Sequence, residues 1–411
     1  MGYTWSTVRG VSWITLLRVS TRIITLLRLS ILGRILTPAQ FGFFGIASLV
    51  LSLLEVITET GINVFLVQEK RDIKKYINSA WVISIIRGTV LAFLIFLFAA
   101  LISSFFNAKG AYEVIALMAI VPFIRGFINP WIVTYQKELI FHKEFQLRFV
   151  LFLIDVIVAI AFALVTRSAT SFAYGLIASA ILEVVLSFVL IPLRPKLQFE
   201  YEKAKRIIQK GWWVTLTGIF LHFADNGDNI AVGKILGSSS LGIYQVAYKF
   251  STLSISEITN VINQVIFPVY AKFSENKERL GKAFIKVIIL SSFGSFLLGG
   301  VIFVFARPII LIFMGEQWIA AIPVIQVLAI YGILRTIFGN FPPLFLSIGR
   351  QDYVAQMTFF RLIGLVIPVV PLVTSFGMLG AGYAMFCSML VEIPVILYFA
   401  YNVFKKNMKL Y

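Results

Sequence analysis

Long apolar stretches separated by short polar segments recur along the chain from Val11 to Val403. A helix that crosses the hydrocarbon core of a bilayer needs about 20 mostly apolar residues, each adding about 1.5 Å of length. Because a helix satisfies its own backbone hydrogen bonds, runs of this length predict membrane-spanning helices. The twelve predicted spans are residues 9–35, 42–67, 77–105, 112–136, 145–166, 170–193, 210–234, 240–270, 281–305, 318–347, 352–376 and 379–404.

The composition of the chain agrees with this pattern. Apolar residues make up 59% of the 411 residues, charged residues make up 13%, and the mean hydropathy is +0.91. A water-soluble fold cannot bury so large an apolar share, so we predict an all-α polytopic membrane protein. The first stretch carries several arginines and no small-residue cleavage site, which favours a retained helix over a signal peptide.

Basic residues are distributed unequally between the two sides of the predicted spans. Loops after even-numbered spans hold most of the Lys and Arg, whereas loops after odd-numbered spans hold Lys109, Arg167, Lys234 and Arg307. Cytoplasmic loops are enriched in Lys and Arg, which places both termini in the cytoplasm and the protein in the cytoplasmic membrane. The same distribution explains the net charge of +17 without a nucleic-acid partner.

The chain is predicted to consist of two halves. The longest charged segment lies near its middle, and we interpret residues 194–209 as a cytoplasmic linker. The linker separates an N-terminal six-helix half at 1–193 from a C-terminal six-helix half at 210–411. An even number of helices per half gives both halves the same orientation, so they are expected to be related by an axis along the membrane normal.

The two halves share a repeated motif. At an offset of 200 residues, LGRILTPAQFGFFGIA (32–47) aligns with VGKILGSSSLGIYQVA (232–247), and we place both of its glycine pairs in turns between helices. These pairs are Gly33/Gly233 and Gly42/Gly242. A weaker similarity relates the fourth span to the tenth, since each contains an Arg, an Asn and a Pro in the same order. The fourth span has Arg125, Asn129 and Pro130, and the tenth has Arg335, Asn340 and Pro342.

Ionisable side chains occur near the middle of several predicted spans, where each costs ~2.5–3.5 kcal/mol on insertion scales. In the first span Arg18 and Arg22 share a helix face and Arg28 lies about 80° to one side, which predicts a basic stripe. We therefore expect a central cavity whose N-terminal wall is cationic and suits an anion, with Asp225 and Asp228 available for a coupling cation. The alternative for any single residue is an internal ion pair or a hydrogen bond between helices.

Motifs of soluble catalytic sites are missing from the sequence. It contains no Gly-rich phosphate loop ending in Lys-Ser/Thr, its only histidines are His142 and His222, and its single cysteine is Cys387. We therefore predict a non-enzyme without a bound cofactor or metal.

Several segments resemble one family. FADNGDNIAVGKILGSSSLGIYQVAYKF (223–250), IVPFIRGFINP (120–130) and YINSAWVISIIRG (76–88) are similar to the prokaryotic polysaccharide transporter family. These are the Wzx and WzxC-type oligosaccharide flippases of the multidrug/oligosaccharidyl-lipid/polysaccharide exporter (MOP) superfamily. The resemblance runs from about residue 10 to 400 and implies a MATE-like fold of twelve helices in two pseudo-symmetric halves.

The resemblance also implies a function. It implies alternating-access translocation of an undecaprenyl-diphosphate-linked oligosaccharide across the cytoplasmic membrane, coupled to a Na⁺ or H⁺ gradient. The implied partners are this lipid-linked oligosaccharide, membrane lipids, a polysaccharide polymerase and a chain-length regulator. The implied coupling-ion residues are Asp225 and Asp228, and the implied diphosphate-binding residues are Arg18, Arg22, Arg28, Arg125, Arg335 and Arg361.

Other functions remain open at the level of sequence. A multidrug or cation antiporter of the same superfamily would be expected to have an acidic cavity. A membrane polymerase or ligase would be expected to carry a large outer loop, and the longest one here, residues 306–317, is short. A scaffold without transport activity would leave the charges inside the spans unexplained.

Overall fold

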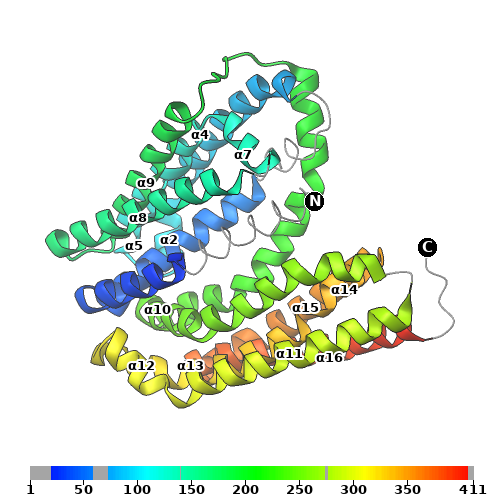
Figure 1. Ribbon diagram of the computed structural model, residues 1–411. Helices are drawn as coiled ribbons and strands as arrows, with labels where there is room; N and C mark the ends of the chain where they lie inside the picture. Colours follow the sequence, from blue (N-terminus) through cyan, green and yellow to red (C-terminus); the bar gives the residue numbers. More distant parts are fainter. Residues whose placement is uncertain (1–19, 59–72, 139, 274–275, 406–411) are drawn as a thin grey trace. The chain divides into compact units, whose positions relative to one another are not determined.

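A computed structural model describes residues 20–58, 73–138, 140–273 and 276–405 (Figure 1). The chain forms two compact units, Met1–Ile219 and Phe220–Tyr411. The described residues are almost entirely helical and contain no β-strand, as the apolar pattern predicts. The linker expected over 194–209 has irregular backbone up to Glu200, and helix α10 begins at Tyr201.

Unit 1 is a bundle in which α8 and α9 pack along each other and α6 contacts α4 and α9. Its helix over residues 20–35 is followed by a short turn. The remaining elements are α2 (Pro38–Ile57), α4 (Lys74–Phe105), α5 (Ala111–Met118), α6 (Ile120–Arg125), η1 (Pro130–Val133), α7 (Thr134–Lys137), α8 (Phe141–Thr166) and α9 (Thr170–Val189).

Unit 2 is built around α13, which packs against both α11 and α16, while α15 and α16 form an antiparallel hairpin (Figure 1). Helix α10 extends into this unit from the end of unit 1. The elements are α10 (Tyr201–Phe273), α11 (Lys277–Val304), α12 (Ala306–Phe313), η2 (Glu316–Trp318), α13 (Ala321–Phe338), α14 (Phe341–Ser347), α15 (Gln351–Phe376) and α16 (Met378–Phe404).

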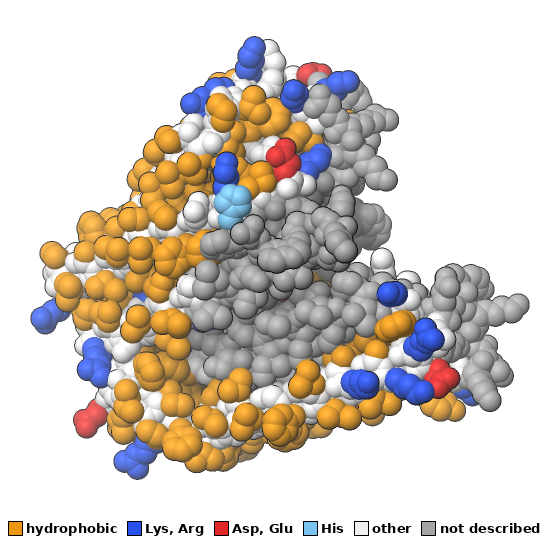
Figure 2. Space-filling model, in the orientation of Figure 1, with side chains coloured by type: hydrophobic (Ala, Val, Ile, Leu, Met, Phe, Trp, Pro, Cys, Tyr) orange, Lys and Arg blue, Asp and Glu red, His pale blue; other side chains and the backbone are white. Residues whose placement is uncertain are grey.

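Eight helices within the described ranges are long and apolar enough to cross a membrane. A ninth candidate is the bent pair Ala111–Arg125 and Pro130–Lys137, whose two parts meet at 78°. Eight of these nine candidates coincide with a predicted span to within four residues at each end, and the exception is α2, which ends at Ile57 instead of residue 67. The outward surfaces of the spans are apolar, as Figure 2 shows for one face. The chain is therefore a multi-pass membrane protein, and the total of twelve spans in two six-helix halves remains a prediction.

The repeated motif surrounds an equivalent break in each unit. In unit 1 the break falls at Thr37, which has extended backbone (φ −77°, ψ 159°) and caps α2. In unit 2 it falls at Gly237, the only non-helical residue within α10 (φ +86°, ψ 176°), a conformation that favours glycine. The offset of 200 residues thus aligns the two breaks.

The aligned glycines of the motif do not form these breaks, which corrects our placement of them in turns. Gly33 and Gly42 lie within the helices on either side of Thr37, and Gly233 and Gly242 lie on either side of Gly237. All four are buried. Small residues at buried helix positions let neighbouring helices approach closely in membranes, which explains their presence near the break.

Buried asparagines lie at a second pair of breaks, where the helices of the fourth and tenth predicted spans are interrupted. Asn129 caps η1 by accepting a hydrogen bond from the Trp131 backbone (3.1 Å) and donates to the Leu193 carbonyl (2.8 Å). Asn340 precedes α14 and donates to Ser291 Oγ (2.9 Å) and the Thr336 carbonyl (2.9 Å). Each amide supplies partners to backbone groups that the helix break leaves unpaired.

We predict that Asn129→Ala lowers the free energy of unfolding by about 2 kcal/mol, because it strands buried backbone groups. Asn78→Ala is the matched control. The Asn78 side chain accepts a hydrogen bond from the Lys196 backbone N–H (2.9 Å) and donates one to Gln198 Oε1 (3.0 Å), but both bonds are exposed to solvent. Asn78→Ala should cost less than half as much. Thermal unfolding in detergent measures both, and an equal or larger loss for Asn78→Ala would contradict the prediction.

Candidate functional site

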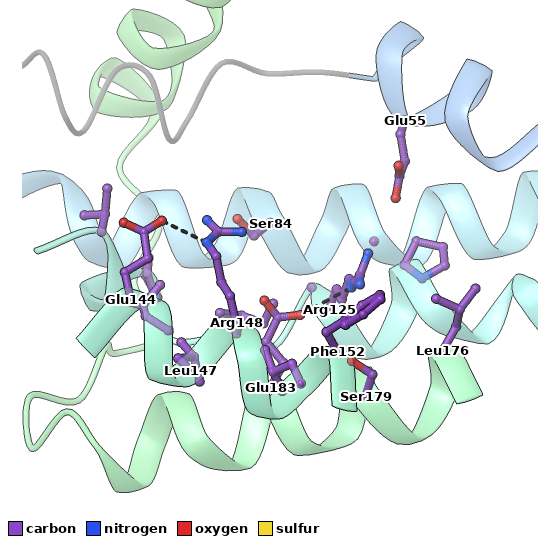
Figure 3. A pocket seen from close by; sticks show the side chains of 18 of the residues that line it. Glu55, Ser84, Arg125, Glu144, Leu147, Arg148, Phe152, Leu176, Ser179 and Glu183 are labelled. Atoms are coloured by element: carbon purple, nitrogen blue, oxygen red, sulfur yellow. Dashed lines mark hydrogen bonds and ion pairs between the residues drawn. The ribbon is translucent and has the colours of Figure 1, made fainter. Parts of the chain in front are cut away.

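A cavity of about 520 Å³ lies within unit 1, between α2, α4, α6, α8 and α9 (Figure 3). Its volume falls in the range of ligand pockets, ~300–1,000 Å³. Its polar wall is dominated by ionisable side chains. Those among the described residues are Glu55, Arg87, Arg125, Glu144, Arg148, Asp155 and Glu183.

One face of α8 supplies much of this charge. Glu144, Arg148 and Asp155 are spaced by four and seven residues, which places them on the same side of the helix. Glu144 accepts hydrogen bonds from Arg148 Nε (2.8 Å) and from Gln136 Nε2 (2.8 Å). The pair leaves the Arg148 side chain 57% exposed, so its remaining donors are available to a ligand.

Arg125 reaches the cavity from the end of α6. Its Nε lies 3.4 Å from Glu183 Oε2 of α9 without forming a hydrogen bond, and the two side chains are 39% and 25% exposed. Figure 3 shows Arg125, Glu183 and Phe152 converging on the same part of the cavity. This is a loose ion pair that a ligand could separate at small cost.

Arg28 is held differently, by a closed ion pair. Its Nη1 and Nη2 donate to the two carboxylate oxygens of Asp155 (2.6 and 3.2 Å), and its guanidinium lies 5.3 Å from the ring of Phe172. The Arg28 and Asp155 side chains are 13% and 8% exposed. A bidentate pair with so little exposure joins the first described helix to α8.

Arg87 contacts the end of α2. It donates to the Glu55 carbonyl (2.8 Å) and to Thr58 Oγ1 (3.2 Å). Cationic donors at a helix C-terminus satisfy its last carbonyls and oppose its dipole. The wall of this cavity within unit 1 is therefore mixed in charge, and the cationic wall expected for a central cavity remains a prediction.

Unit 2 contains a second charged cluster, on α10, α13 and α15. Asp225 Oδ1 accepts from Arg335 Nη2 (3.2 Å) and from Arg361 Nη2 (3.0 Å), and Arg335 Nη1 also donates to the Tyr248 hydroxyl (3.0 Å). Arg335 and Asp225 are 37% and 40% exposed, whereas Arg361 is 15% exposed. One carboxylate thus faces two guanidinium groups, which leaves the trio with a net positive charge.

Asp228 lies one helical turn from Asp225 but is fully buried. Tyr244 donates its hydroxyl proton to Oδ2 (2.7 Å), and Oδ1 accepts from the backbone N–H (2.8 Å) and the side chain (3.1 Å) of Asn229. Among the described residues no basic group forms an ion pair with Asp228. No group of three or more His, Cys, Asp or Glu side chains in the described ranges could hold a metal.

The two units carry ion pairs of opposite polarity at corresponding helices. In unit 1 the cation, Arg28, is on the first helix and the anion, Asp155, is on the fifth. In unit 2 the anion, Asp225, is on α10, the first helix of that half, and the cation, Arg361, is on α15, the fifth. Both pairs therefore join the first predicted span of a half to the fifth, with the signs exchanged, although the 200-residue offset does not align the paired residues themselves.

Residues 31–323 match the family described as polysaccharide biosynthesis protein, which covers more than half of the chain. This chain belongs to that family. The resemblance to polysaccharide transporters seen in the sequence is thereby confirmed.

Two relatives illustrate the similarity of this family member to known proteins. An uncharacterized membrane protein in the cps region of Klebsiella pneumoniae is 25% identical over 384 residues, which is 91% of this chain and 78% of that protein. The lipopolysaccharide biosynthesis protein WzxC of Escherichia coli K12 is 24% identical over 359 residues, 86% of this chain and 73% of that protein.

Solved structures share the fold. The lipid II flippase MurJ in an inward closed conformation has a TM-score of 0.77 at 15% identity, covering 94% of this chain and 87% of MurJ. An inward-facing multidrug resistance MATE family transporter of the MOP superfamily has a TM-score of 0.72 at 16% identity, covering 96% and 99%. At these identities the likeness establishes a MOP-type, MATE-like fold.

The structure of this family member brings some of the predicted site residues together. Arg335, Arg361 and Asp225 form one cluster, and Arg125 lines the unit 1 cavity together with Asp155, the partner of Arg28. Asp228 has its own hydrogen bonds. Arg22 is half-buried on the helix over 20–35 and does not line the cavity, and Arg18 lies outside the described residues.

Two cavity residues were missed because they were assigned to a loop. Glu144 directly precedes the predicted span 145–166, and Arg148 falls near its start. Both lie within α8, because this helix begins at Phe141. Their spacing to Leu151 and Asp155 follows the i, i+4, i+7, i+11 pattern of one helix face, which was the available signal.

Proposed function

We propose that this protein is a flippase that moves an undecaprenyl-diphosphate-linked oligosaccharide, the repeat unit of a polysaccharide, across the cytoplasmic membrane. The observation that carries the proposal is a charged, ligand-sized cavity inside a helical membrane bundle of the polysaccharide biosynthesis family. Relatives named for lipopolysaccharide biosynthesis and a fold shared with a lipid II flippase support it. We further propose transport by alternating access, with both termini in the cytoplasm.

Exposure separates the candidate diphosphate ligands into two groups. Arg125 and Arg335 are 39% and 37% exposed, whereas Arg28 and Arg361 are 13% and 15% exposed. A guanidinium group can bind a phosphate only if some of its N–H donors are accessible to that phosphate. We therefore propose Arg125 and Arg335 as the residues that contact the diphosphate, and Arg28 and Arg361 as residues that position the helices carrying the site.

Coupling to a Na⁺ or H⁺ gradient is also proposed, with Asp225 and Asp228 as candidates. Asp225 already faces two guanidinium groups, whereas Asp228 is buried with neutral partners. A buried carboxylate without a cation is costly to ionise, so Asp228 suits a proton better than a sodium ion. Polymerase and chain-length regulator remain proposed partners, and the activity requires no covalent chemistry by the protein.

The test is complementation of a strain whose surface glycan depends on this gene. We predict that Arg335→Ala, and separately Arg125→Ala, reduces surface glycan at least tenfold while lipid-linked repeat units accumulate inside, because each removes charge-assisted hydrogen bonds to phosphate. Arg307→Ala, at an exposed arginine of α12, is the matched control and should transport normally. Unchanged glycan in both Arg335→Ala and Arg125→Ala, with normal protein levels, would refute the assignment.

A second candidate function is favoured by one observation. Four carboxylates, those of Glu55, Glu144, Asp155 and Glu183, line the unit 1 cavity. A multidrug/cation antiporter of the same superfamily would use such groups to bind cations. Drug-resistance assays on cells that express this chain distinguish the two: increased resistance to cationic drugs, together with failure to restore surface glycan, would favour the antiporter.

A further inference from the structure

Arg148 lies at the end of the unit 1 cavity where α8 begins. It is seven residues beyond Phe141, the first residue of α8, and seven before Asp155, so these positions are spaced by about 10 Å along the helix. The cavity thus extends along α8 from this end to the depth of the Arg28–Asp155 pair. The proposed orientation of the chain places the start of α8 on the cytoplasmic side, because the segment before it follows the fourth span.

The Arg148 side chain presents accessible donors to this cavity. Its Nε donates to Glu144 Oε1 (2.8 Å), and within the described ranges Arg148 forms no other hydrogen bond or ion pair. A guanidinium group carries five N–H donors, so the four on its two Nη atoms remain for a ligand. The side chain is 57% exposed, and Figure 3 shows it extending from α8 into the cavity.

Glu144 holds Arg148 in this position without enclosing it. A single carboxylate oxygen, Oε1, accepts from Arg148 and also from Gln136 Nε2 of α7 (2.8 Å), so the carboxylate is fixed between two helices. The Glu144 side chain is 19% exposed and therefore more buried than its partner. An exposed i, i+4 ion pair adds little to stability, so the fold gains little from this arrangement. Its main effect is to orient the Nη atoms of Arg148 toward the cavity.

The chemistry of these donors selects a phosphate. A planar fork of N–H groups matches the oxygens of a phosphate, whereas a cation finds no acceptor on a guanidinium group. Leu147 and Leu151, which flank Arg148 on α8, are buried and line the same cavity, so a phosphate bound there loses part of its water. Glu144 offsets the charge of Arg148 and so lowers its affinity for an anion. A moderate affinity suits transport, because a carrier must release its ligand.

We propose that Arg148 binds the diphosphate of the lipid-linked substrate at the cytoplasmic end of the unit 1 cavity, before the diphosphate reaches Arg125. Arg125 lies near the middle of the fourth predicted span, 112–136, and so deeper in the membrane. Glu144 and Gln136 are positioning residues that act through Arg148. The inference rests on the proposed function, since the diphosphate is the anion that this substrate would bring to the cavity.

The test is equilibrium binding of two probes to the purified full chain in detergent: undecaprenyl diphosphate, and undecaprenol, which lacks the diphosphate. Arg148→Ala should weaken binding of undecaprenyl diphosphate about tenfold and leave binding of undecaprenol unchanged. Glu144→Gln keeps an acceptor oxygen but removes the negative charge, so it should tighten diphosphate binding about threefold. Lys143→Ala is the matched control, because Lys143 is an exposed cation of α8 that does not line the cavity, and it should change neither affinity.

Opposite shifts in Arg148→Ala and Glu144→Gln would support the inference, because a purely structural ion pair would weaken binding in both. Three outcomes would overturn it: unchanged diphosphate binding in Arg148→Ala, equal losses for both probes in that variant, or equal binding of both probes by the wild-type protein. The proposed function fails in a different way. Diphosphate binding that depends on Arg148, in a chain that does not restore surface glycan, would refute the flippase and keep the site.

Discussion

Asp155→Ala is expected to lower the free energy of unfolding by about 3–5 kcal/mol, because it leaves the Arg28 guanidinium buried without its carboxylate. Both partners are nearly closed to solvent, at 13% and 8% exposure, and the two hydrogen bonds are 2.6 and 3.2 Å long. No other described carboxylate forms an ion pair with Arg28 that could take over. Thermal or denaturant unfolding in detergent measures the loss.

The matched control for this change is Glu144→Ala on the same helix. Its partner Arg148 is 57% exposed, and an exposed i, i+4 pair contributes only about 0.3–0.5 kcal/mol. The double variant Arg28→Ala/Asp155→Ala should be less destabilised than the sum of the two single variants, because each single variant leaves one buried charge unpaired and the double variant leaves none. A loss in Asp155→Ala no larger than that in Glu144→Ala would refute the structural role of the pair.

Gly380→Ala is expected to destabilise the α15–α16 hairpin by about 3 kcal/mol or more. A Cβ at Gly380 would lie 1.9 Å from the Leu372 carbonyl oxygen and 2.8 Å from the Val373 nitrogen. These are backbone atoms at the end of α15, so the clash cannot be relieved by a side-chain rotation and the helices must separate. Gly380 lies three residues beyond Gly377, whose φ of +61° forms the tight turn between them.

Gly300→Ala is the control for Gly380→Ala. It also lies within a helix, but a Cβ there meets no atom within 4 Å, so the added methyl should be neutral or stabilise by up to about 1 kcal/mol through helix propensity. Unfolding of the two variants in the same detergent gives the comparison. Similar stability of both would show that α15 and α16 are not packed as closely as described.

The exchanged polarity of the two ion pairs bears on the proposed mechanism. The unit 1 pair is closed, whereas in unit 2 a single carboxylate is shared by two arginines, one of them more than one-third exposed. An ion pair between the same two predicted spans of each half, with its sign reversed, can hold the helices together in both units while changing what each unit can bind. We expect changes at Arg28 to reduce stability first, and changes at Arg335 to reduce transport first.

Much of the fold follows from local sequence. Apart from the end of α2, apolar runs locate the described spans to within several residues, because burial in hydrocarbon depends on the side chains of that segment alone. The 200-residue repeat aligns the breaks at Thr37 and Gly237, since turn formation is also local. The family could be recognised from the same segments, because they retain enough of its motifs.

The tertiary structure alone decided which charges meet. Arg28 and Asp155 are 127 residues apart, and Asp225 and Arg361 are 136 apart, and no periodicity within a helix reports contacts between helices. The sequence therefore identified the charges that are costly in a membrane and predicted a cationic wall. Helix packing places carboxylates beside the arginines of the unit 1 cavity. It also places Arg148, which was assigned to a loop, in the wall of that cavity. Hydropathy determines which segments enter the membrane, but the neutralisation of a buried charge depends on its neighbours in space.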